Sequence, residues 1–290
     1  MHHYTMMSAL LTIHKPLVSV SWLCQHIDAR NLVILNGTMP KVTAKKEVSF
    51  LETTQIPNAR FFDIQNEFSK QDAAYPNMSL QPEVFEAKTR ELGINNDSCI
   101  VVYDEHGIYS SPRVWWLFKT MGFDNIAVLN GGFPAWKLAG GMVEKKVNRA
   151  VAYGNFDVRH RAHLFVDASK VMKALSDRSK QIIDARATGR FYAREAEPRQ
   201  DLRSGHIPSS KSLPYAQVLE RGELRSVAEL QDLFFEIGAS NKDLIFSCGS
   251  GITACVLALG ATLAGFEKVA VYDGSWSEWG SKPELPIEIL

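Results

Sequence analysis

Residues 243–279 read DLIFSCGSGITACVLALGATLAGFEKVAVYDGSWSEW, and residues 99–136 read CIVVYDEHGIYSSPRVWWLFKTMGFDNIAVLNGGFPAW. Both stretches contain, in the same order, an apolar strand, a short loop, an apolar helix, the pair Gly-Phe, a second apolar strand, a glycine and a tryptophan. The spacing from the glycine of Gly-Phe to the later glycine is also the same in both. Self-similarity over this length predicts two equivalent structural units in one chain.

Short apolar strands alternate with helical patterns in each half, which is the order found in α/β domains. The runs at 99–103 and 243–247 are continuously apolar rather than alternating, so they favour a parallel sheet covered on both faces. Helical patterns at 81–93 and 226–238 each end in a glycine, a common residue after a helix C-terminus. We therefore expect an α/β fold with two tandem domains, each a mainly parallel sheet flanked by helices.

The stretch before residue 163 has weak periodicity and mixed charge, which is typical of a connection between domains. We place the first domain at residues 1–145, a linker at residues 146–162 and the second domain at residues 163–290.

The charge of the chain is balanced, with 32 Lys and Arg residues against 32 Asp and Glu residues. No overall field therefore favours nucleic acid or an anionic membrane as a partner. The four cysteines form no CxxC pair and no zinc-ligand spacing, and Cys24 and Cys99 are expected to be buried. The apolar N-terminal stretch lacks a preceding basic region and is interrupted at 14–16, so we expect a cytoplasmic protein without a signal or membrane span.

Cys248 begins the glycine-rich loop CGSGIT, which follows an apolar strand and precedes an apolar helix. Successive amides of such a loop can point at one atom, with the N-terminus of the helix behind them. This arrangement favours an anion, and therefore a nucleophilic thiolate. The alternative is that Cys248 only packs in the core, as free cysteines commonly do, but its position favours the nucleophile. The equivalent residue of the first half is Asp104, so only the second half carries a thiol here.

At this loop the sequence resembles the two-domain rhodanese superfamily and, within it, the 3-mercaptopyruvate sulfurtransferases. The neutral loop CGSG is the most specific part, because thiosulfate-type rhodaneses typically carry a basic CRKG loop. The resemblance covers nearly the whole chain, and its motifs are CGSGITA (248–254), DARATGRF (184–191), EPR (197–199), GHIP (205–208) and YDGSWSEWG (272–280).

The resemblance implies that the Cys248 thiolate attacks the sulfur of 3-mercaptopyruvate, that pyruvate leaves as its enolate, and that the enzyme keeps a persulfide. A thioredoxin-like dithiol, a low-molecular-weight thiol or cyanide then removes the outer sulfur, without a metal or organic cofactor. Ser250 would relay a proton in the first step, and Asp63 would orient Ser250. Relatives often have a histidine shortly after this aspartate, whereas this chain has Asn77 near that place.

The same resemblance implies that Arg190 and Arg199 bind the carboxylate and keto group of the substrate, since a guanidinium fork matches a carboxylate. The alternative for either arginine is an ion pair at the surface or between domains. The loop residues whose amides would cradle the negative charge of the persulfide are Gly249, Gly251, Ile252 and Thr253.

Other functions are open from the sequence. A thiosulfate sulfurtransferase would use the same persulfide with another donor, and a non-catalytic module would carry sulfur or bind a partner. A cysteine-dependent phosphatase needs an arginine at the sixth position after the nucleophile, and this chain has Ala254 there. Without that arginine the phosphate dianion loses its main charge partner, so the sequence disfavours a phosphatase.

Overall fold

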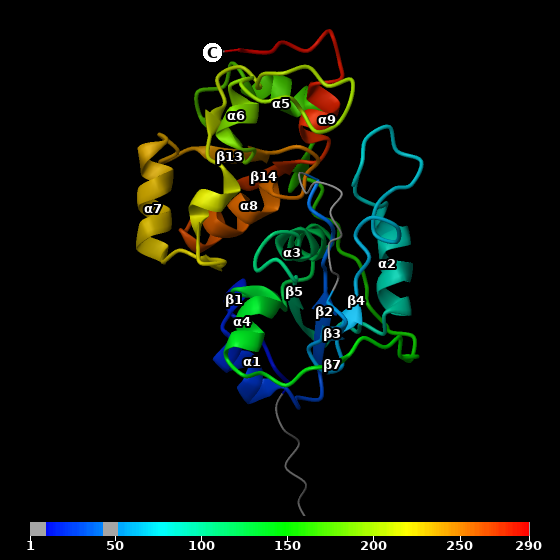
Figure 1. Ribbon diagram of the computed structural model, residues 1–290. Coiled ribbons are helices and arrows are strands. Elements are labelled where there is room, and N and C mark those ends of the chain that lie inside the picture. Colours follow the sequence, from blue (N-terminus) through cyan, green and yellow to red (C-terminus); the bar gives the residue numbers. More distant parts are fainter. Residues whose placement is uncertain (1–9, 43–51, 290) are drawn as a thin grey trace, which may run out of the picture.

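The computed structural model describes residues 10–42 and 52–289. The beginning of the N-terminal stretch considered above, residues 1–9, lies outside the described residues. Two α/β units follow one another along the chain (Figure 1). The first contains β1 (Leu17–Val18), α1 (Val20–His26), β2 (Leu32–Asn36), β3 (Thr54–Gln55), β4 (Arg60–Phe61), α2 (Pro82–Glu91), β5 (Cys99–Tyr103), α3 (Ser111–Thr120), β6 (Ile126–Leu129), α4 (Gly132–Leu138) and β7 (Glu144–Lys145).

The second unit repeats this plan. It contains β8 (Phe165–Val166), α5 (Ala168–Ala174), β9 (Lys180–Asp184), α6 (Thr188–Phe191), β10 (Lys211–Ser212), the 3₁₀ helix η1 (Tyr215–Val218), β11 (Leu219–Glu220), β12 (Glu223–Leu224), α7 (Val227–Glu236), β13 (Asp243–Ser247), α8 (Ala254–Leu263), β14 (Val269–Tyr272) and α9 (Ser275–Trp279). It has more short elements between β9 and α7 than the first unit has between β2 and α2.

The two main sheets have the same topology. Strands are ordered β1-β6-β5-β2-β4 in the first sheet and β8-β14-β13-β9-β10 in the second, and every pair in both sheets is parallel. Two short antiparallel pairs, β3 with β7 and β11 with β12, lie outside the sheets. The predicted α/β fold with two tandem, mainly parallel sheets is confirmed.

Helices cover both faces of each sheet, because successive side chains of a strand point to opposite faces. In the first sheet Ile34 packs in a cluster with residues of α1 and α4, while Val33 and Leu35 pack in another with residues of α2 and α3. In the second sheet Ile245 packs with α5 and α9, while Leu244 packs with α7 and α8. Burial on both faces explains why these strands are apolar at consecutive positions.

The two units share one hydrophobic core at their interface. Helix α3 of the first unit contacts α8 of the second, and the two lie one above the other in the centre of Figure 1. The cluster that contains α3 and the first sheet continues through α8 into the second sheet. An interface built like a domain interior disfavours independent motion of the units.

A buried ion pair crosses this apolar interface. Arg113 on α3 is fully buried, and its Nη2 donates to Oδ1 of Asp273, which follows β14, at 2.7 Å. The other carboxylate oxygen of Asp273 accepts from the amide and hydroxyl of Ser79 in the first unit, at 2.9 and 2.8 Å. The Arg113 guanidinium also donates to the carbonyls of Asn77, at 2.7 Å, and Gly251, at 3.2 Å.

The segment after β7, residues 146–162, contains no helix or strand and packs back onto the first unit. The Phe156 ring is fully buried among the phenylalanines of that unit, and the amide of Arg159 donates to Met121 O at 2.9 Å. This segment is therefore packed against the first unit and is not a free linker. Our domain boundaries remain predictions.

The expectation for the cysteines holds for Cys99 but is wrong for Cys24. Cys99 begins β5 and is fully buried, whereas Cys24 is exposed on α1. Leu23 is the buried residue of that short helix, so its neighbour points away from the sheet. Within the described part of the chain, no helix has the length and apolar character needed to cross a bilayer.

We predict that Arg113→Ala strongly destabilises the protein, because it leaves the Asp273 carboxylate buried without its charge partner. Breaking a buried pair in this way costs about 3–5 kcal/mol. The measurement is urea unfolding followed by tryptophan fluorescence, with Arg149→Ala as control. Arg149 pairs with Glu144 at the surface, so its removal should leave the midpoint of unfolding nearly unchanged. Equal midpoints for both variants would contradict the role of the Arg113 pair.

Candidate active site

Cys248 lies at the carboxyl end of β13, the edge of a parallel sheet where ligands commonly bind. Its side chain is 1% exposed. The Cys248 amide donates to Ser275 Oγ at 3.1 Å, and its carbonyl accepts from Trp276 N at 2.9 Å. Ser275 has φ +48°, an uncommon conformation for a residue other than glycine. The start of α9 therefore holds the backbone of the cysteine in place.

The loop that follows Cys248 leaves its amides free for a ligand. Within residues 10–42 and 52–289, the backbone amides of 249–253 make no hydrogen bond. The loop leads directly into α8, whose N-terminal end carries partial positive charge. Of the predicted loop residues, Ile252 is buried, and Thr253 is the N-cap residue of α8. Unpartnered amides at a helix N-terminus form a site for an anion.

The first unit shows what this loop geometry binds. Asp104 follows β5 at the position that Cys248 takes after β13, and its carboxylate is fully buried. One oxygen accepts from the amides of Tyr109, Ser110 and Ser111 at 2.9, 3.0 and 2.9 Å. The first loop thus holds its own carboxylate, while the equivalent residue of the second loop carries a thiol.

A side chain would be unfavourable at Gly249 and at Gly251 for different structural reasons. Gly251 has φ +77°, and a Cβ atom there would lie 2.9 Å from Asp273 O and 3.1 Å from Arg113 Nη1. Gly249 has an ordinary φ, but a Cβ atom would lie 3.3 Å from Arg190 Nη2 and 3.5 Å from Arg199 Nη1. Both arginines therefore lie close to the loop beside Cys248, and their role in substrate binding remains a prediction.

Arg190 and Arg199 differ in their charge partners. Arg190 donates to Glu197 at 2.5 Å, and the same carboxylate accepts from Arg186 at 2.7 Å. The ion pair of Arg190 is largely buried and lies within the second unit, so it is neither a surface pair nor a pair between domains, and the guanidinium still faces Gly249. Within the described residues Arg199 makes no ion pair. Burial lowers the pKa of Arg199, and a nearby Cys248 charge opposes this effect.

Within the described residues, the cluster of Arg186, Arg190 and Arg199 carries one unmatched positive charge. Its three guanidinium groups have only two carboxylate partners. Glu197 pairs with Arg186 and Arg190, and Asp184 pairs with Arg186 at 2.7 Å. Arg186 and Arg190 each contact a carboxylate, whereas Arg199 contacts none among the described residues. The unmatched charge therefore resides mainly on Arg199. An arginine in this state, beside unpartnered amides, fits a ligand with one negative charge.

Ser250 is 4% exposed and has two hydrogen-bond donors around its hydroxyl oxygen. Asn77 Nδ2 from the first unit donates to Ser250 Oγ at 3.0 Å, and Arg199 Nη2 donates to it at 3.1 Å. The first unit therefore contributes a side chain to the surroundings of the Cys248 loop, although its own equivalent loop has no thiol. In the sequence, Asn77 stands out only as a departure from relatives.

The expected contact between Asp63 and Ser250 is absent from the hydrogen bonds of the described residues. The Asp63 carboxylate accepts from the amides of Gln65 and Asn66 and from the Asn66 side chain, at 2.9–3.2 Å. A carboxylate followed by a tight turn satisfies the nearby amides first. We therefore correct the expected role of Asp63: in this structure Asn77 contacts Ser250.

Tyr109 is a site residue that the sequence analysis missed. It comes from the first unit and is buried, with its ring 5.8 Å from that of Tyr215. Burial, followed by the nearby Tyr215 and Cys248, raises the pKa of Tyr109 to about 12. The phenol is thus protonated at neutral pH and can donate a hydrogen bond. No motif or spacing marks it in the sequence.

The neighbouring Cys255 is not a second nucleophile. It is fully buried on α8, and its thiol donates to Gly251 O at 3.3 Å. Burial raises the pKa of Cys255 to about 12, so it stays protonated. Among the described residues, no group of three or more His, Cys, Asp or Glu side chains is arranged to hold a metal ion.

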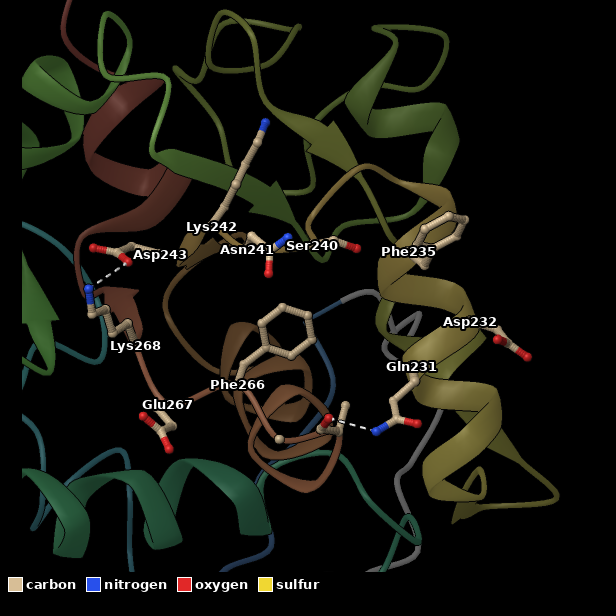
Figure 2. A pocket seen from close by; sticks show the side chains of 12 residues that line it. Gln231, Asp232, Phe235, Ser240, Asn241, Lys242, Asp243, Phe266, Glu267 and Lys268 are labelled. Atoms are coloured by element: carbon tan, nitrogen blue, oxygen red, sulfur yellow. Dashed lines mark hydrogen bonds and ion pairs between the residues drawn. The ribbon is translucent and has the colours of Figure 1, made fainter.

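A large surface cavity lies far from this loop. It has a volume of about 730 Å³ and is drawn in Figure 2, between α7 and the turn after α8. Asp243 lines it at the start of β13, whereas Cys248 follows the end of that strand. Figure 2 shows Phe235 and Asp232 on α7 and the Asp243–Lys268 ion pair, with no cysteine among the lining residues.

Known proteins match this chain over almost its full length. The family described as Rhodanese-like domain matches twice, at 19–139 and 167–282. The 3-mercaptopyruvate sulfurtransferase of Escherichia coli O157:H7 is 37% identical over 276 residues, covering 94% of this chain and 98% of that protein. Thiosulfate/3-mercaptopyruvate sulfurtransferase 1, mitochondrial, of Arabidopsis thaliana is 35% identical over 298 residues, covering 94% and 78%.

A solved structure gives the same result. The crystal structure of SseA from Escherichia coli, described with the rhodanese fold and mechanism of 3-mercaptopyruvate sulfotransferases, has a TM-score of 0.81 to this chain. The two are 34% identical, and the match covers 90% of this chain and 99% of SseA.

We predict that Cys248 reacts faster with anionic iodoacetate than with neutral iodoacetamide, relative to the exposed Cys24 in the same protein. The reason is the unpaired Arg199 guanidinium beside the loop. The preference should reach roughly tenfold or more, because a hydrogen bond to a charged group contributes about 1.5–3 kcal/mol. Peptide mass spectrometry of both cysteines gives the two rates. The preference should disappear in Arg199→Ala, and its persistence there would place the attracting charge elsewhere.

Proposed function

This chain belongs to the rhodanese family and is a sulfurtransferase enzyme, and we propose that it takes sulfur from 3-mercaptopyruvate through a persulfide on Cys248. Both of its domains match the family, and relatives with this activity are similar over nearly the whole chain. The observation that carries the choice of nucleophile is the loop at 248–253, where a cysteine precedes amides that make no hydrogen bond with any described residue, at the start of α8.

In the proposed first half-reaction, the Cys248 thiolate attacks the thiol sulfur of 3-mercaptopyruvate. The carbon–sulfur bond breaks, its electron pair passes to the organic product as the enolate of pyruvate, and Cys248 keeps the sulfur as a persulfide. The enolate then takes one proton to give pyruvate. The free amides of 249–253 would stabilise negative charge on the persulfide, as the equivalent loop stabilises Asp104.

In the second half-reaction an acceptor thiolate attacks the outer sulfur and restores the Cys248 thiolate. We propose a thioredoxin-like dithiol or a low-molecular-weight thiol as the acceptor, and cyanide can take the same place. The four cysteines are free, which supports a location in the reducing cytoplasm.

The choice of donor rests on the charge of the arginine cluster. 3-Mercaptopyruvate has one carboxylate, which matches the single unmatched positive charge near Arg199. Thiosulfate carries two negative charges on a smaller body, and the loop CGSG adds no cationic side chain of its own. Thiosulfate is therefore the competing donor that an assay must include, and we expect it to be the poorer one.

We predict a higher kcat/KM for 3-mercaptopyruvate than for thiosulfate, measured side by side with the same acceptor. Arg199→Ala should lower kcat/KM for 3-mercaptopyruvate by about 2–5 kcal/mol in transition-state free energy, the scale for losing one partner of a buried charge pair. Arg149→Ala, at the surface, should have no effect.

Cys248→Ser provides the control for chemistry, because a hydroxyl cannot form a persulfide. It should release no pyruvate from 3-mercaptopyruvate and gain no sulfur atom by intact-protein mass spectrometry. A better kcat/KM with thiosulfate would overturn the proposed donor, and turnover by Cys248→Ser would overturn the proposed nucleophile.

A further inference from the structure

The hydroxyl of Ser250 has one hydrogen and two lone pairs, and both lone pairs face donors. Asn77 Nδ2 lies 3.0 Å from Ser250 Oγ, and Arg199 Nη2 lies 3.1 Å from it. We propose that Asn77 and Arg199 fix Ser250 as a hydrogen-bond donor to the substrate, so that this site works without a histidine or an Asp63 relay. The inference rests on the proposed function and assigns Asn77 as a positioning residue.

The position of Asn77 is set by the domain interface. It is 7% exposed, and its carbonyl accepts from Arg113 Nη2 at 2.7 Å. The same guanidinium donates to Gly251 O at 3.2 Å, so Arg113 holds Asn77 and the loop of Ser250 together. Asn77 has φ +61°, a conformation that asparagine tolerates better than most residues.

Neither neighbour can take a proton from Ser250. A carboxamide nitrogen and a guanidinium are donors only, and the guanidinium stays charged at any pH used for an assay. Within the described residues, Ser250 Oγ donates to no acceptor. The remaining group, the hydroxyl hydrogen, is therefore available to a ligand in the site, and Ser250 cannot serve as a base.

A hydrogen-bond donor at Ser250 suits the cleavage of the carbon–sulfur bond, in which negative charge develops on the substrate. As the carbon–sulfur bond breaks, its electron pair delocalises onto the former keto oxygen of the enolate. A hydrogen bond from Ser250 to that oxygen stabilises the developing charge, and the proton stays on Ser250. The enolate carbon later takes its proton from water, so the serine needs no proton acceptor behind it.

The proposal predicts losses of different size for two substitutions that both suit a positive φ. Asn77→Asp replaces the donor by an acceptor, so the Ser250 hydroxyl turns toward it and kcat falls by about 10²-fold at neutral pH, the lower end of the range for losing one hydrogen bond to a developing oxyanion. Asn77→Gly only removes one donor, and kcat falls about two- to tenfold. The readout is kcat, because a carboxylate beside Arg199 also weakens binding of an anionic substrate.

The pH profile separates this role from a structural one. Protonation of the new carboxyl gives it a hydrogen that can again be donated to Ser250. The kcat of Asn77→Asp, divided by that of the unmodified protein at each pH, should therefore rise as the pH is lowered. Asn241→Asp is the matched control, since Asn241 also has a positive φ, is exposed and lies by the distant cavity. Its ratio should stay near one.

A double-mutant cycle shows whether Asn77 acts through Ser250. In a Ser250→Ala background, Asn77→Gly and Asn77→Asp should have little further effect on kcat. Equal losses with and without Ser250, or an unchanged kcat in Asn77→Asp, would overturn the proposal.

The contact can also be observed without turnover. In protein labelled with ¹⁵N-asparagine, one side-chain amide proton of Asn77 should have a hydrogen-bonded chemical shift that is lost in Ser250→Ala. Absence of this change would overturn the inference even in an active enzyme. If the shift is present but 3-mercaptopyruvate is not turned over, the proposed donor is wrong while the orientation of Ser250 stands.

Discussion

The buried contact between Arg113 and Asp273 is the constraint on which the site depends. It joins α3 of the first domain to the end of β14 in the second, inside a continuous apolar core. An ion pair in such surroundings needs further hydrogen bonds to offset the cost of burying its charges, and among the described residues only Nε of the three Arg113 nitrogens has no partner. Three of these contacts go to the carbonyls of Asn77 and Gly251 and to Ser79. The groups that neutralise the buried charge are thus the groups that position the reactive loop.

A comparison of the two halves of the repeat shows what the first domain, which lacks the thiol, contributes to the site. Both halves have the same parallel sheet and the same loop between a central strand and an apolar helix. In the first half the loop is occupied by the carboxylate of Asp104, so that it is closed to an external anion. In the second half the equivalent residue is Cys248, and the loop amides make no hydrogen bond with the part of the chain that the structure describes. The first domain instead contributes Asn77 and Tyr109 to the surroundings of the other loop.

Sequence reasoning predicted the features that depend on local pattern. The repeat, the parallel sheets and the loop followed from strand composition and glycine spacing, whereas the two arginines were indicated only by the resemblance to the family. The errors concern side chains whose partners are chosen by tertiary contacts. Asp63 satisfies its own turn, and Cys24 falls on the outer side of a short helix. Arg113 comes from the other domain and donates to Gly251 O of the loop, and no spacing within the chain indicates this contact.

The most direct test of this account is a crystal structure of the protein trapped after one turnover with 3-mercaptopyruvate and no acceptor. We predict a second sulfur atom on Cys248 Sγ that points at the amides of residues 249–253, with Ser250 still contacted by Asn77. An unmodified Cys248 after pyruvate release, or an outer sulfur directed away from these amides, would contradict the claim that both domains together build a persulfide-binding loop.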